Sequence, residues 1–150
     1  MKKVIGMKNM DTVKLLQECD AGVKMGITSI DEVLEKVCSS EFRELLIESR
    51  EHHEKLENEI DDLLKQYNAE EKEPNPIAKG MSWMKTNMKM GMNHDDSTVA
   101  ELITDGANMG VKSLNQYLNK YTAADEKAKK ICERLIQIEE KLGKELQKYL

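Results

Sequence analysis

Residues 40–67 read SEFRELLIESREHHEKLENEIDDLLKQY, and this stretch decides the fold class. Its apolar side chains recur at steps of three or four: Phe42, Leu45, Leu46, Leu56, Ile60, Leu63, Leu64 and Tyr67. That spacing places them on one face of an α-helix, with charged residues on the other face. A serine at 39 or 40 can accept hydrogen bonds from the first amides of this helix. We therefore predict a long amphipathic helix that buries one face.

The segment before this stretch has the same periodicity, from near Asp11 to Val37. Gly22 and Gly26 lower its helix propensity, and a break near Gly26 is the alternative to one continuous helix. The apolar stripe keeps its phase across both glycines, so we predict a continuous helix.

Three more helices are predicted after residue 67. The acidic run at 70–73 indicates a solvated loop. Asn75-Pro76 then opens a short helix that runs to about Met92. Thr98 with Glu101 forms a capping box for a fourth helix, and Thr122 with Asp125 caps a fifth that extends to Tyr149.

Composition supports one helical domain over residues 1–150, with residues 1–10 loosely held or disordered. Charged residues make up 34% of the chain and aromatic residues only 4%, which is typical of a salt-bridge-rich helical protein. The net charge of −5 and the lack of a basic cluster argue against nucleic-acid and membrane partners. Three widely spaced cysteines, Cys19, Cys38 and Cys132, fit a reducing compartment, so we expect a cytoplasmic protein.

Four long helices and a short one between the second and the fourth suggest two hairpins joined by a long crossover. Three stretches also look familiar: residues 15–24, 79–83 and 104–112. Together they resemble an uncharacterised bacterial family of short ferritin-like bundles, from about Asp11 to Leu150. The resemblance implies an all-α, ferritin-like four-helix bundle with an additional short crossover helix.

A di-iron site of the ferritin-like type needs Glu-x-x-His on two helices and an inward Glu on each of the other two. Here Ser49 stands where the Glu of such a pair with His52 would lie, and the last helix has no histidine. We therefore predict a bundle without a di-iron site and with no cofactor. The alternative is a rebuilt mid-bundle site for iron or another transition metal, acting on iron, oxygen or peroxide; its candidate ligands are His52, His53, Asp20, Asp105 and Glu139.

Two features indicate packing or protein contacts. The short crossover helix carries Met81, Trp83, Met84 and Met88, which favour an adaptable packing or binding face over a Cu(I) site. Gly106 and Gly110 have the spacing that lets a neighbouring helix approach closely.

No motif of a known catalytic centre is present, so we lean against an enzyme. The preferred function is self-association, with a dimer favoured, or the binding of an unknown protein partner. The alternative is a ferritin-like metal-binding protein or oxidoreductase.

Overall fold

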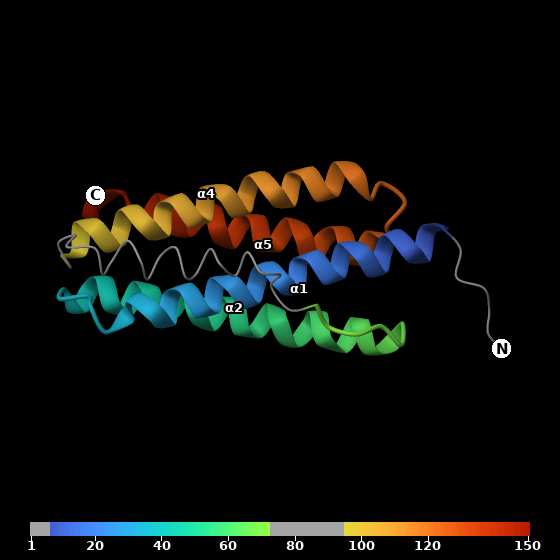
Figure 1. Ribbon diagram of the computed structural model, residues 1–150, viewed down its shortest axis with the longest axis horizontal. Coiled ribbons are helices and arrows are strands. Elements are labelled where there is room, and N and C mark those ends of the chain that lie inside the picture. The colour runs from blue at the N-terminus through green and yellow to red at the C-terminus, as the bar shows by residue number, and fades with distance from the viewer. Residues whose placement is uncertain (1–6, 73–94) are drawn as a thin grey trace.

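The computed structural model describes residues 7–72 and 95–150, which form a bundle of four α-helices (Figure 1). The helices are α1 (Met7–Leu34), α2 (Ser40–Gln66), α4 (Asp96–Lys120) and α5 (Glu126–Glu145), followed by the 3₁₀ turn η2 (Gln147–Tyr149). No strand occurs within these two ranges. The prediction of an all-α helical bundle is therefore confirmed.

Hydrogen bonds between the turns fix the direction of each helix. The Asp96 carboxylate accepts from the backbone amides of Cys38 and Ser39, so α4 begins beside the α1–α2 turn. At the other end, the backbone amide of Ala123 donates to Asp11, so the α4–α5 turn lies beside the start of α1. The chain thus forms two antiparallel hairpins, in which α2 and α4 run in the same direction (Figure 1).

Helix α1 is continuous through Gly22 and Gly26, as predicted from the unbroken apolar stripe. It begins at Met7, four residues before the expected start near Asp11. Ser39 caps α2 by accepting from the amide of Phe42, in agreement with the predicted serine cap.

The predicted capping box of Thr98 and Glu101 is wrong, and of the pair Thr122 and Asp125 only Asp125 caps its helix. Helix α4 is capped by Asp95, which accepts from the amide of Thr98, and α5 is capped by Asp125, which accepts from the amide of Ala128. Aspartate is at least as good an N-cap as threonine, and each of these aspartates precedes its helix in extended backbone. Thr122 lies outside α5, in the turn that binds the start of α1.

The core consists of two apolar clusters, one toward each end of the bundle. The first joins residues such as Val23, Leu56 and Ile136, and the second joins Ile30, Leu46 and Leu142. On α1, α2 and α5 the two clusters are separated by a short stretch at mid-height. His53, on α2, and Glu139, on α5, lie in that layer.

The predicted crossover helix lies outside the described residues, and with it Met81, Trp83, Met84 and Met88. Among the helices that the structure describes, none combines the length and the apolar character needed to cross a bilayer.

Candidate functional sites

A buried ion pair occupies the middle of the bundle. The Nε2 atom of His53, on α2, lies 2.9 Å from Oε2 of Glu139, on α5. The Nδ1 atom of the same ring lies 2.7 Å from the backbone carbonyl oxygen of Ser49. His53 is fully buried and Glu139 is 8% exposed, so the pair joins the two hairpins inside the core.

Two glycines face this pair, and Gly26 makes room for it. A Cβ atom at Gly26, on α1, would lie 2.8 Å from two atoms of the His53 ring, closer than real Cβ contacts allow. A Cβ atom at Gly110, on α4, would lie 3.8 Å from the Glu139 side chain. The imidazole therefore fills space that a side chain on α1 would otherwise take, which explains why this helix tolerates Gly26 at its centre.

Hydrogen bonding sets the charge of His53. Both of its partners, a carboxylate and a backbone carbonyl, are acceptors, so both ring nitrogens donate only when the ring is an imidazolium. Burial by itself lowers the pKa of His53, but the hydrogen bond and charge of Glu139, with the Ser49 carbonyl, outweigh it. The pKa of His53 is therefore raised above its ordinary value of 6.5.

The other candidate ligands of the predicted mid-bundle metal site lie elsewhere. His52 is 47% exposed, and its Nε2 atom lies 3.9 Å from a carboxylate oxygen of Glu48, on its own helix. Asp105 is exposed on α4. Asp20 lies on α1 six residues before Gly26, which is about 9 Å along the helix axis. The structure thus brings together His53 and Glu139 and separates them from His52, Asp105 and Asp20.

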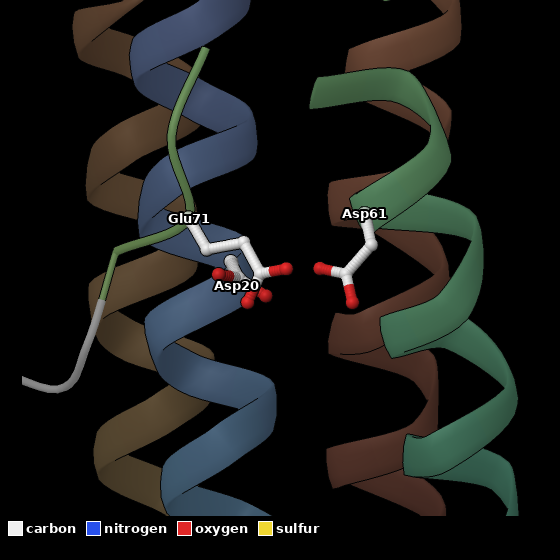
Figure 2. A group of neighbouring side chains, drawn as sticks. All are labelled: Asp20, Asp61 and Glu71. Atoms are coloured by element: carbon white, nitrogen blue, oxygen red, sulfur yellow. The ribbon is translucent and has the colours of Figure 1, made fainter. Parts of the chain in front are cut away.

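Asp20 belongs instead to an acidic cluster with Asp61, on α2, and Glu71, in the segment after α2. One carboxylate oxygen from each residue lies within 4.8 Å of the others. Figure 2 shows the three carboxylates turned toward one another between α1 and α2. Among residues 7–72 and 95–150, this is the group of three acidic, His or Cys side chains with the spacing of a metal site.

Asp20 is the buried member of the cluster, with no exposed surface. Its Oδ2 atom accepts from the Lys24 ammonium at 2.7 Å and from the backbone amide of Lys72 at 3.1 Å. Its Oδ1 atom is buried and has no hydrogen-bond partner, and the same is true of Oδ1 of Asp61. Buried carboxylate oxygens are normally paired, so two unpaired ones in a single cluster indicate unmet demand for a donor or a cation.

The end of α2 explains how Glu71 reaches α1. Asn68 has a left-handed backbone (φ 55°), and the amides of Asn68 and Ala69 donate back to the carbonyls of Lys65 and Leu64. This is a Schellman cap, which ends a helix and reverses the chain. Residues 69–72 then run back along α1.

The returning segment is held by polar contacts with α1. The Gln17 side chain donates to the Glu70 carbonyl at 2.9 Å, and Lys72 donates to Glu18 at 2.7 Å. Residues 70–72 form the loop that the charge run indicated, with Glu70 and Glu71 exposed, and these polar contacts hold the loop against α1. The loop delivers a carboxylate to the side of α1.

The electrostatics of the cluster show an excess of negative charge. Burial raises the pKa of Asp61, and the charges of Asp20, Glu71 and Glu57 raise it further, to about 6 against the opposing charge of Lys24. Burial likewise raises the pKa of Asp20, despite its bonds to Lys24 and Lys72. One ammonium thus does not neutralise these carboxylates.

Sequence reasoning identified Asp20 but missed Asp61 and Glu71. A weak signal for Asp61 exists, because Glu57 and Asp61 lie four residues apart and so share a helix face. For Glu71 the signal is Asn68, a residue that favours the left-handed C-terminal cap. Neither signal shows that α2 and the segment after it pack against the face of α1 that carries Asp20.

The predicted glycine pair divides between two environments. Gly106 faces open space, with nothing within 4 Å of a Cβ atom built there, whereas Gly110 faces Glu139. The exposed large hydrophobic residues of the described chain lie on separate elements: Met10, Ile47, Met109 and Leu150.

An open groove of about 310 Å³ lies between α2 and α5 and is lined by both acidic and basic side chains. His52 lies along it, as does Arg134, whose guanidinium pairs with Glu59 at 2.6 and 2.8 Å. The mixed charge of this groove favours no one class of ligand.

Comparisons with protein-family models, curated proteins and solved structures gave no match to this chain.

Proposed function

We propose that this chain is a ferritin-like helical bundle that binds a divalent cation through Asp20, Asp61 and Glu71. The observation that carries the proposal is the convergence of three carboxylates, one of them fully buried with an unpaired Oδ1 atom. Two oxygens that each lie about 2.4 Å from one ion are at most about 4.8 Å apart. The spacing in the cluster is within that limit.

The donor set indicates the class of cation. All three ligands are carboxylates, which suit the hard ions Mg²⁺, Ca²⁺ and Mn²⁺. A nitrogen or sulfur donor, as preferred by zinc or copper, does not belong to the group. The function therefore centres on a hard divalent ion held at the side of the α1–α2 hairpin.

The ferritin-like assignment is supported by the parallel course of α2 and α4, which a long crossover connection produces. It is also supported by the polar layer at mid-height, where such bundles place their metal centres. In this chain the layer is filled by a histidine and a carboxylate that satisfy each other. We place the cation about two turns away, beside Asp20.

The test is titration of chelator-treated protein with Mn²⁺, followed by electron paramagnetic resonance of the unbound ion. We expect about one Mn²⁺ per chain, displaced by Ca²⁺ or Mg²⁺. Asp20→Asn and Asp61→Asn should each weaken binding at least tenfold, because each removes a charged ligand.

Asp105→Asn is the matched control, since it removes an exposed carboxylate outside the cluster. Circular dichroism of each variant shows whether the helices are retained. Binding that is absent, or that is lost equally in the Asp105 variant, would contradict the proposal.

A second candidate function is self-association through the outer face of α4. Met109 is 66% exposed, the highest value among the exposed large hydrophobic residues of the described chain, and the open Gly106 position one turn away allows close approach of another helix. Sedimentation equilibrium should then give a dimer that Met109→Ser weakens. A monomer at 100 μM would exclude this candidate.

A further inference from the structure

Lys24 already holds a positive charge at the acidic cluster. Its ammonium lies 2.7 Å from Oδ2 of Asp20 and 2.9 Å from Oε1 of Glu71, so it bridges two of the three proposed ligands. Its side chain is 16% exposed, and the two carboxylates raise its pKa against the effect of burial. The ammonium therefore stays charged and competes for these oxygens with any added ion.

We infer that Lys24 is a built-in competitor that leaves Asp20 and Glu71 when a divalent cation binds, and that it sets the affinity and charge selectivity of the site. This inference rests on the proposed function. It makes Lys24 a residue that determines specificity rather than a ligand. The displacement of Lys24 also distinguishes this site from a cluster whose carboxylates stay paired with the lysine of the same chain.

Charge counting gives the physical reason. Four carboxylates, from Asp20, Glu57, Asp61 and Glu71, influence one another here. A monovalent ion that displaces the ammonium replaces one unit charge by another and gains nothing in net attraction. A divalent ion adds one further positive charge and so gains net attraction to these carboxylates.

The geometry allows the exchange. Lys24 has a four-carbon stem with several rotatable bonds, and it reaches the cluster from α1 at the same helix face as Asp20, four residues earlier. A rotation of the stem moves the charge without moving the helix. Asp20 would then keep its bond from the Lys72 amide, which holds residues 70–72 in place.

The test is the Mn²⁺ titration repeated on Lys24→Met, which keeps the stem and removes the charge. We expect the dissociation constant for Mn²⁺ to fall at least tenfold, and 150 mM K⁺ to compete more strongly than in the unmodified chain. Lys72→Met is the matched control, because the Lys72 ammonium pairs with Glu18 outside the proposed ligand set. It should change the constant less than threefold.

The outcomes separate the two proposals. Equal affinity in the unmodified chain and in Lys24→Met would overturn the role of Lys24 and leave the cation function intact. Binding in neither would overturn both. Binding in Lys24→Met alone would show that Lys24 blocks the site, so the displacement inference and the proposed function would both fail for the natural chain.

If Lys24→Met does not fold by circular dichroism, Lys24→Gln answers the same question. The glutamine can still donate to Asp20 while lacking the charge.

Discussion

The mid-bundle layer and the acidic cluster treat buried charge in opposite ways. In the layer, one imidazolium meets one carboxylate, and the remaining ring nitrogen meets a backbone carbonyl. In the cluster, Lys24 faces several carboxylates, and two buried oxygens have no partner. Both regions use an ionisable side chain of α2, so the fold alone does not make the difference.

The contrast teaches how to separate a structural charge from a functional one. A matched buried pair needs nothing from solution, and breaking it leaves an uncompensated charge in the core. An unmatched group has a standing electrostatic cost that a cation or a proton relieves. We therefore expect His53 and Glu139 to serve stability, and the proposed function gives Asp20, Asp61 and Glu71 to cation binding.

The largest expected effect comes from breaking the matched pair. His53→Leu leaves the Glu139 carboxylate buried without a partner, which should lower the free energy of unfolding by about 3 to 5 kcal/mol. Urea denaturation measures the change. His52→Leu is the control, because its side chain is 47% exposed, and it should change stability by less than about 0.5 kcal/mol.

The double variant His53→Leu with Glu139→Leu sharpens this result. It removes both charges, so most of the lost stability should return. A loss below about 1 kcal/mol in His53→Leu alone would contradict the structural role of the pair.

Overpacking the same layer should have a smaller effect. Gly26→Ala places a Cβ atom 2.8 Å from the His53 ring, and the resulting strain should exceed the gain of about 1 kcal/mol in helix propensity. We expect a net loss of about 1 to 2 kcal/mol in thermal or urea unfolding.

Gly106→Ala makes the matched comparison on α4. It meets nothing within 4 Å, so it should stabilise the chain by up to about 1 kcal/mol. If Gly26→Ala and Gly106→Ala changed the free energy of unfolding in the same direction, crowding by the His53 ring would not explain the glycine at position 26.

The smallest effect concerns the unmatched cluster and its pH dependence. Folding raises the pKa of Asp61 from 3.8 to about 6. Between these two pH values the folded chain keeps a proton on Asp61 that the unfolded chain has released. The contribution of Asp61 to stability is therefore lost as the pH rises from about 4 through 6. Asp61→Asn should stabilise the cation-free protein by about 1 kcal/mol at pH 7, after allowance for solvent screening.

The matched pair loses stability in a different pH window. The pKa of His53 is raised above 6.5, so the contribution of its charged form is complete below that value and is lost as the pH rises through the higher folded pKa. Chemical denaturation from pH 4 to 9 should show the first loss reduced in Asp61→Asn and the second absent in His53→Leu. If stability were instead lost over a single pH range, and both variants removed that loss, the two regions would not titrate independently.

Helix periodicity predicted most of the fold because each long helix has a strong local apolar pattern. The capping threonines were misplaced because each has an aspartate three residues away that caps a helix equally well. Asp95 precedes Thr98 and caps α4, and Asp125 follows Thr122 and caps α5. The continuity of α1 at Gly26 followed from the phase of its stripe.

The candidate site was less predictable. His52 and His53 are adjacent, and a helix turn of about 100° separates their directions, so only the exact phase of α2 decides which one is buried. Asp20 lies more than 40 positions along the chain from both Asp61 and Glu71. No local pattern encodes the meeting of these three carboxylates, which depends on the Schellman turn at Asn68 and on how α1 packs against α2.

The most direct test of the central claim is a crystal structure of the protein grown with Mn²⁺, with anomalous data collected near the manganese absorption edge. We predict one strong anomalous peak about 2.1 to 2.4 Å from carboxylate oxygens of Asp20, Asp61 and Glu71, with the Lys24 ammonium moved away. A saturated crystal with no peak at the cluster, and with Lys24 still bridging Asp20 and Glu71, would contradict the account.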